Sequence, residues 1–319
     1  MTAGVRRLFA RPSAGPLIAL VVVYAVFAAL RPDSFASSIA IELMLRSTVK
    51  VALCAVGMTL VIVAGGIDLS VGSVVALVTV VIARMLEGGS GPLAAAVAGL
   101  AVGVLAGVVN GALVSALRIT PFIVTLGTMS ALRGAAKGLA REQKIDAPSK
   151  GLESLMRLAP KGSLQVLPIG VWIAALVAVA GAVLLGHTRP GRRIVAVGSS
   201  ADAARLAGIS VARTTLFVYA ALGLAAGVAG LLELSALTVG DPTDSIGLEL
   251  QVIAAVVIGG GSLSGGRGSI GGAISGALLM TVIANGATHL GLATWVQEIL
   301  TGFIIALAVA LDRLRQSSS

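Results

Sequence analysis

One carboxylate, Asp68, lies inside an apolar and glycine-rich run, VIVAGGIDLSVGSVVAL, which covers residues 61–77. An ionisable side chain in such a run is costly and marks a candidate site for substrate contact or proton transfer. The letters DLSVGS also suit a helix start, where a carboxylate accepts hydrogen bonds from free backbone N–H groups and favours the helix dipole. We expect Asp68 to cap the following helix, and contact with a substrate is a second, compatible interpretation.

Other chemically active groups are sparse. His187 and His289 lie in separate regions, and Cys54, the single cysteine, sits in an apolar segment, so we expect neither a metal site nor a disulfide. The glycine-rich stretch GGGSLSGGRGS (259–269) lacks the lysine of a phosphate-binding loop. We therefore expect no catalytic residues, no ATPase site and no cofactor in this chain.

The composition is that of an integral membrane protein. Hydrophobic residues make up 57% of the 319 residues and charged residues 12%, and the mean hydropathy is +1.02. The 41 glycines and the low aromatic content of 3% favour closely packed helices over a β-barrel. In a membrane protein, a net charge of +9 is explained by basic residues that set the orientation of the helices and that attract anionic lipid, so we do not expect nucleic-acid binding. We expect an all-α polytopic bundle, with residues 1–319 forming a single transmembrane domain.

About ten segments are long and apolar enough to span a bilayer. Basic residues place both termini and the loop 187–213 in the cytoplasm, including Arg6, Arg7 and Arg11. The loop 141–165 argues against this orientation, because it would be external although it carries five basic residues. The expected spans are 16–31, 47–66, 70–86, 92–116, 121–140, 166–186, 214–237, 248–263, 269–290 and 293–311.

An internal repeat links the two halves of the chain. Residues 63–72 read VAGGIDLSVG and residues 257–266 read VIGGGSLSGG, sharing V-x-G-G-x-x-L-S-x-G at an offset of 257 − 63 = 194. Glycine pairs at matching places in two halves of a membrane protein indicate broken helices around a translocation path. Glycines that serve only helix packing are the alternative.

The loop 187–213 is the longest polar stretch that this topology leaves inside. Its segment SADAARLAG predicts a short helix, which Ser200 or Asp202 can cap and Gly208 can end. A structured loop of this kind favours docking to a partner, although an ordinary amphipathic connector is the competing interpretation.

Four motifs, in order, resemble those of the permeases of bacterial ABC importers for monosaccharides, the ribose-type permease family. The resemblance covers the chain from about residue 40 to the C-terminus. The motifs are GMTLVIVAGGIDLSVGS (57–73), NGALVSALRITPFIVTLGTMSALRG (110–134), GRRIVAVGSSADAARLAGISVAR (191–213) and IAAVVIGGGSLSGGRGSIGGA (253–273).

This resemblance implies a set of partners and a mechanism. The partners are a second permease copy or paralogue, a cytoplasmic ABC ATPase that binds ATP and Mg, and a periplasmic or lipid-anchored sugar-binding protein. The permease would then lie in the bacterial inner membrane and carry ribose or a similar sugar or polyol by alternating access.

Within the resemblance, SADAARLAG looks like the coupling helix that docks on the ATPase. The sequence departs from the common pattern GGNEEAARLSG at Ser199 and Ser200, and at Ala201 and Asp202, which removes one negative charge. The coupling residues carried over are Asp202, Ala203, Ala204, Arg205, Leu206 and Gly208.

A path for neutral, hydroxyl-rich sugars needs backbone groups and small polar side chains. An ion-coupled secondary transporter of a small polar solute is the alternative function, and it would make Asp68 essential. The expected path residues are Gly65, Gly66, Asp68, Ser70, Asn110, Thr125, Thr128, Gly259, Gly260, Ser264 and Asn285.

Overall fold

The computed structural model describes residues 14–146, 148, 150–158 and 166–317. The arginines Arg6, Arg7 and Arg11, used above for orientation, lie outside the described residues. The elements in chain order are α2 (Ala14–Leu30), α3 (Pro32–Phe35), α4 (Ser38–Val63), α5 (Val71–Glu87), α6 (Pro92–Leu117), α7 (Pro121–Ala140), β1 (Ile145–Asp146), the 3-10 helix η1 (Leu152–Leu155), α8 (Ile169–His187), α9 (Arg189–Ser199), α10 (Ala201–Leu206), α11 (Val211–Leu237), β2 (Val239–Gly240), α12 (Leu248–Ile258), α13 (Ile270–His289) and α14 (Thr294–Ser317).

The structure is a helical bundle, as predicted. Each of the ten expected segments contains one helix. Five of the described helices, α4, α6, α8, α11 and α13, are long and apolar enough to cross a bilayer. The expectation of ten crossings stays a prediction, because α12 has only 11 residues. At 1.5 Å per residue α12 is about 16 Å long, which is short of a hydrocarbon core about 30 Å thick.

Two predicted boundaries are wrong for local reasons. The segment expected over 47–66 begins earlier, at Ser38, because the Ser37 side chain caps α4 by accepting a hydrogen bond from the Ala40 N–H. The segment expected over 248–263 ends earlier, at Ile258, because Gly260 adopts a φ of +89° and turns the chain.

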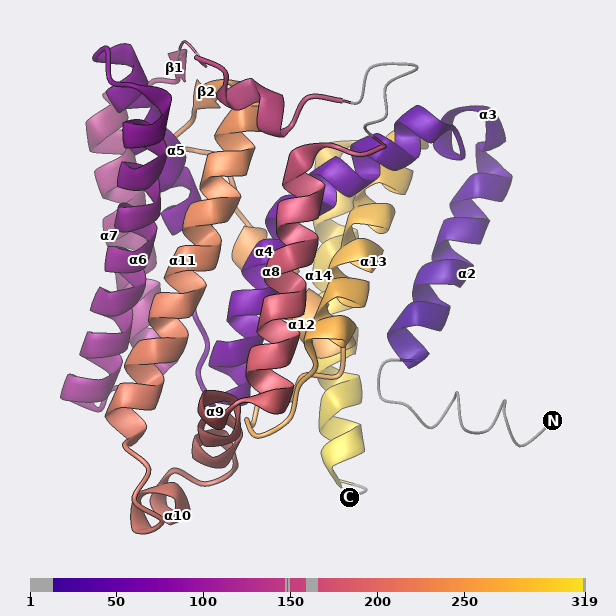
Figure 1. Cartoon of the computed structure of the whole chain (residues 1–319). Coiled ribbons are helices and arrows are strands. Elements are labelled where there is room, and N and C mark those ends of the chain that lie inside the picture. The colour runs from indigo at the N-terminus through magenta and orange to yellow at the C-terminus, as the bar shows by residue number, and fades with distance from the viewer. Residues whose placement is uncertain (1–13, 147, 149, 159–165, 318–319) are drawn as a thin grey trace, which may run out of the picture.

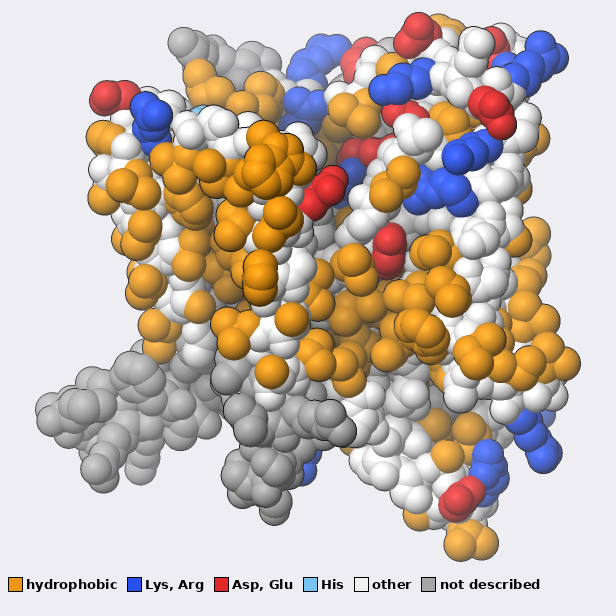
Figure 2. All heavy atoms as spheres, turned by 180° about the vertical axis from the view of Figure 1, so that it is seen from behind, with side chains coloured by type: hydrophobic (Ala, Val, Ile, Leu, Met, Phe, Trp, Pro, Cys, Tyr) orange, Lys and Arg blue, Asp and Glu red, His pale blue; other side chains and the backbone are white. Residues whose placement is uncertain are grey.

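The long helices run roughly side by side, and α9 and α10 lie together at one end of the bundle (Figure 1). The first residues of α2 and the last residues of α14 lie at that same end, whereas the short β1–β2 pair lies at the opposite end (Figure 1). Figure 2 shows charged side chains gathered toward both ends, with hydrophobic side chains between them. This banding is what a bilayer-spanning bundle requires.

The core forms around α4 and α11. In the most apolar stretch of α4, 83% of the residues are buried inside the protein, against 17% in α8. α11 packs against α4, α5 and α6. The outward-facing apolar side chains of α6 and α8 include Leu105, Trp172 and Leu176, which are available to lipid or to another subunit.

Glycines allow α6 and α11 to approach backbone to backbone. A Cβ atom on Gly103 would lie 2.5 Å from the carbonyl oxygen of Gly223 and 2.8 Å from the Cα of Gly227. A Cβ on Gly107 would overlap the carbonyl oxygen of Tyr219. No side chain fits at these positions unless the helices separate, so the small residues set the distance between them.

We predict that Gly107→Ala destabilises the bundle by about 1–3 kcal/mol, because the added methyl group overpacks the α6–α11 contact. Alanine is intrinsically the better helix former, so any loss must come from the contact. The measurement is thermal unfolding of the purified protein in detergent. Gly127→Ala in α7, where a Cβ has nothing within 4 Å, is the control, and an equal loss in both variants would contradict the packing explanation.

Candidate functional site

Asp68 lies at the centre of a buried hydrogen-bond network between α4 and α5. Its side chain is only 3% exposed. Oδ1 accepts hydrogen bonds from the backbone N–H and from the hydroxyl of Ser70, each at 2.7 Å. Oδ2 accepts from the amide Nδ2 of Asn110 in α6 at 3.1 Å, and that amide also donates to the Ser70 hydroxyl at 2.8 Å. The carboxylate thus has donors on both oxygens although the surroundings are apolar.

Two further helices, α7 and α11, contact the segment that connects α4 to α5, and both do so at one carbonyl group. The carbonyl oxygen of Ile67 accepts from the Tyr219 hydroxyl in α11 at 3.2 Å. The Thr125 hydroxyl in α7 lies at the same distance from it and shares its single proton with the Pro121 carbonyl, which is closer at 2.9 Å. The α4–α5 connection is therefore fixed by side chains from α6, α7 and α11. Tyr219 is absent from the predicted site, since its partner is a backbone carbonyl 152 positions away in sequence, for which no sequence pattern exists.

The position of Asp68 fits a role at the start of α5. Ser70 precedes the first residue of α5, and its own side chain makes no capping hydrogen bond. Asp68 instead accepts from the Ser70 N–H two residues further on, which satisfies a donor at the helix entry. Whether the carboxylate also contacts a substrate stays a prediction.

The predicted path residues form two groups. Asp68, Ser70, Asn110 and Thr125 share the network described above, and Thr128 joins it through the Thr125 carbonyl at 3.2 Å. Gly259, Gly260 and Ser264 belong to the second break, where the Ser264 and Ser262 hydroxyls bond at 2.8 Å. Asn285 is in neither group, because its amide donates to Thr281 within α13.

Both glycine breaks end a helix by the same hydrogen-bond pattern. In the first, the N–H groups of Gly65 and Gly66 donate to the carbonyls of Ile62 and Val61. In the second, Gly260 and Gly261 donate in the same way to Val257 and Val256. Gly65 and Gly260 have φ values of +85° and +89°. The matching helix ends are therefore 260 − 65 = 195 residues apart. The sequence match has an offset of 194, so it aligns Gly65 with Gly259, whereas the hydrogen bonds show that Gly65 and Gly260 have equivalent positions.

The coupling segment is a capped helix that projects from the bundle. The Ser200 hydroxyl accepts from the Ala203 N–H at 3.2 Å, so of the two expected caps Ser200 is the one used. Gly208 adopts a φ of +77° after the helix end, and Asp202 and Arg205 form an ion pair at 2.5 Å. Leu206 is 91% exposed, whereas Ala204 is only 3% exposed. Of the six coupling residues, Ala204 therefore faces the protein, while Asp202, Ala203, Arg205, Leu206 and Gly208 are exposed.

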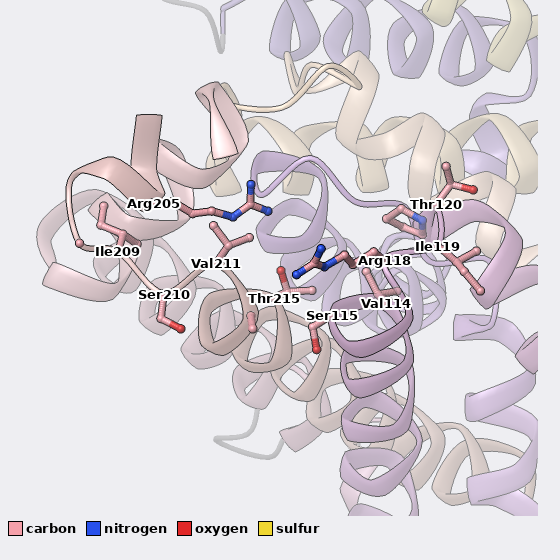
Figure 3. A pocket seen from close by; sticks show the side chains of 13 residues that line it. Val114, Ser115, Arg118, Ile119, Thr120, Arg205, Ile209, Ser210, Val211 and Thr215 are labelled. Carbon is pink, nitrogen blue, oxygen red and sulfur yellow. The ribbon is translucent and has the colours of Figure 1, made fainter. Parts of the chain in front are cut away.

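A pocket of about 720 Å³ separates the α10–α11 connection from the α6–α7 connection. Arg205 comes from one wall and Arg118 from the other, and both side chains extend into the space between (Figure 3). Arg118 ends α6 in the left-handed conformation, with a φ of 53°. The two guanidinium groups make this face of the coupling segment suitable for an acidic partner.

Charged side chains of α4, α7 and α11, together with Asp244 in the segment before α12, form a second cluster. None of these residues is in the predicted site. Lys50 of α4 pairs with Glu233 of α11 at 2.5 Å and lies 3.5 Å from Asp244. Arg133 of α7 donates to the carbonyl oxygens of Pro242 and Asp244 at 2.9 and 2.6 Å. Together these contacts hold the segment 241–247, which leads into α12. A signal existed in the sequence, because opposite charges within predicted spans tend to pair.

Asp241 at the start of this segment is held by groups outside the helices. It accepts from the N–H and the hydroxyl of Thr243 at 2.8 and 2.6 Å, and it pairs with Lys144 at 3.0 Å. Partial burial raises the pKa of the Asp241 carboxyl, but the hydrogen bonds from Thr243 and Lys144 lower this pKa more, and the net direction is downward. The contact is therefore complete above the ordinary carboxyl pKa and is lost as the pH falls through the lowered value.

Within the described residues, no group of three His, Cys, Asp or Glu side chains is placed to hold a metal ion. Cys54 is buried. What the geometry offers is a buried polar network, two glycine breaks and an exposed, capped helix, α10.

The model of the family described as "Branched-chain amino acid transport system / permease component" matches residues 40–309. The chain belongs to this permease family. The permease is 39% identical over 300 residues to Ribose import permease protein RbsC of Escherichia coli (strain K12), covering 94% of this chain and 93% of that protein. It is 36% identical over 303 residues to Ribose import permease protein RbsC of Bacillus subtilis (strain 168), covering 95% and 93%.

A third relative, Fructose import permease protein FrcC of Rhizobium meliloti, is 34% identical to the permease over 312 residues, covering 96% of this chain and 86% of that protein. No solved structure matches the sequence. The permease is thus similar, over more than nine-tenths of its length, to transport subunits that import sugars.

We predict that Asp68→Asn keeps most of the stability and transport of the permease, whereas Asp68→Ala does not. Alanine leaves the Ser70 and Asn110 donors buried without an acceptor, at about 1–3 kcal/mol for each unsatisfied group. Asparagine keeps one acceptor oxygen for Ser70. Its amide can donate to the Asn110 Oδ1, which has no partner in the described structure, once the Asn110 amide group turns over. Thermal unfolding and solute uptake measure the two variants. Equal damage from both would show that the charge itself is required.

We predict that Lys50→Met lowers stability by about 1–3 kcal/mol, because the mostly buried Glu233 and Asp244 carboxylates lose the donor that they share. The double variant Lys50→Met/Glu233→Gln should recover part of this loss, and Lys50→Arg should be close to wild type. Unfolding in detergent measures all three. A double variant less stable than Lys50→Met would contradict the pairing.

Proposed function

We propose that the permease is the membrane subunit of an ATP-driven ABC importer, which carries a monosaccharide or polyol across the bacterial inner membrane by alternating access. The observation that carries this proposal is similarity to the ribose import permease of Escherichia coli over 94% of the chain. ATP and Mg would bind a partner ATPase, since the permease sequence holds no phosphate-binding loop.

The relatives support a sugar over an amino acid, although the family is described as an amino acid transport system. A zwitterionic amino acid would be favoured by charged groups or helix ends that complement its carboxylate and its ammonium group. The single carboxylate of the network, Asp68, is already engaged by Ser70 and Asn110. The hydroxyl of Ser70 and the amide of Asn110 are engaged in the same network, so the relatives that import ribose and fructose, and not free groups at the breaks, carry the substrate class.

The expected orientation places α10 and both chain ends in the cytoplasm. α10 lies at the same end of the bundle as the start of α2 and the end of α14 (Figure 1). Arg118 and Arg205, which line the pocket at this end, agree with the positive-inside rule.

The partners follow from this mechanism. We propose a second permease copy or paralogue, a cytoplasmic ATPase docked on α10, and a periplasmic or lipid-anchored sugar-binding protein at the opposite end. The exposed Leu206 supports docking on α10, because an apolar side chain that is 91% exposed on a projecting helix suits insertion into a partner. Arg205 and Arg118 would meet acidic groups of the ATPase beside it.

The test is reconstitution of the permease with the ATPase and the binding protein encoded beside it. We expect ATP-dependent uptake of one labelled sugar or polyol from a panel of ribose, fructose, allose and ribitol, with leucine as the comparison. We expect Arg205→Glu to lower this uptake about ten-fold or more, because it places a second acid beside Asp202 on the docking face. Arg141→Glu lies at the end of α7 far from α10, matches the charge change and should leave assembly with the ATPase unchanged, whereas Arg205→Glu should weaken it.

Two results would contradict the proposal. Uptake of leucine in place of any sugar would overturn the substrate class. Accumulation driven by a proton or sodium gradient, with the permease alone, would favour an ion-coupled secondary transporter. Ala204→Asp is unsuited to this test, because Ala204 is buried and the change would disturb packing instead of docking.

A further inference from the structure

Three backbone segments that are distant in sequence meet at Gly198, in the last turn of α9. A Cβ atom on Gly198 would overlap the carbonyl oxygen of Val63, the last residue of α4, and would lie 2.7 Å from the amide nitrogen of Gly266. The Gly266 N–H in turn donates to that same Val63 carbonyl at 2.9 Å. The end of α9 thus lies directly against both glycine breaks, backbone to backbone.

The contact involves a glycine from each segment. A Cβ on Gly265 would lie 2.6 Å from the carbonyl oxygen of Gly198 and 3.1 Å from the Cα of Gly65. Gly65 and Gly265 also have φ values of +85° and +87°, which other residues adopt with strain. We name Gly65, Gly198, Gly265 and Gly266, with the Val63 carbonyl, the glycine junction.

α9 is joined to the coupling helix without a free linker. Ser200 is the C-cap of α9: its N–H donates to the Ala196 carbonyl at 3.1 Å, and its extended backbone, with a φ of −163°, ends the helix. The same residue caps α10, because its hydroxyl accepts from the Ala203 N–H. A displacement of α10 therefore reaches α9 through one residue whose backbone and side chain are both engaged.

We propose that the glycine junction transmits the movement of α10 to both glycine breaks together, and that Gly198 is the positioning residue of this coupling. The inference rests on the proposed function, since it assumes an ATPase that moves α10. Side chains would separate the three backbones and could absorb a displacement by changing rotamer. Direct contact leaves no such freedom, and close-packed interiors transmit strain.

The first test is Gly198→Ala, with Gly186→Ala as the matched control. Gly186 lies in α8, and a Cβ there has nothing within 4 Å. We expect Gly198→Ala to assemble with the ATPase and to hydrolyse ATP within about two-fold of wild type, while sugar uptake per ATP falls about ten-fold or more. The control should match wild type in both activities. Unchanged uptake per ATP in Gly198→Ala would overturn the proposal.

A second measurement uses the wild-type complex, so that poor folding of a variant cannot hide the answer. Hydrogen exchange is followed in peptides covering residues 195–200, 64–70 and 259–268, with and without a non-hydrolysable ATP analogue. We expect all three regions to change together on nucleotide binding. A change in residues 195–200 without the other two would overturn transmission through the junction.

The two proposals fail in different ways. If the wild-type complex does not import any sugar with ATP, the proposed function is wrong. If the wild type and Gly186→Ala import sugar, but Gly198→Ala does so with the same yield per ATP, only the junction is wrong.

Discussion

The structure depends on backbones that touch where no side chain intervenes. Gly103 and Gly107 bring α6 against α11, and Gly198 brings α9 against both breaks. In a bilayer, apolar side chains gain little by leaving lipid for protein, so close packing and backbone contact supply much of the association. This constraint explains why glycine is abundant in the helices and not only in the turns.

The second requirement is that polar groups inside the bundle find partners. The Ile67 carbonyl, left free by the break, accepts from the Tyr219 hydroxyl and lies within reach of the Thr125 hydroxyl. Asp68 has donors on both of its oxygens, and Lys50 lies beside two carboxylates. Broken backbone is tolerated at membrane depth only when neighbouring helices satisfy it. The backbone groups freed at the breaks and the buried polar side chains therefore depend on each other, because each supplies the hydrogen-bond partners that the other needs.

This arrangement changes how the opening feature is understood. Asp68 looked like an isolated charge beside a glycine pair, but its partners come from α5 and α6, and the adjacent carbonyl is held by α7 and α11. The carboxylate thus secures the first break, while the second break relies on backbone contacts and on the Ser262–Ser264 pair. The two breaks share a helix-ending pattern and differ in what holds them.

The sequence by itself determined the helical membrane class, the approximate place of each long helix, the glycine breaks and a short capped helix within residues 200–208. These are local properties, because apolar length, glycine pairs and capping residues act within a few positions of one another. Only the tertiary structure decided that Asn110 and Thr125 meet Asp68 and its neighbour, that Asn285 does not, and that Tyr219 and Lys50 belong to the polar interior. Such contacts depend on how helices distant in sequence pack, and no local pattern encodes the distance between two backbones.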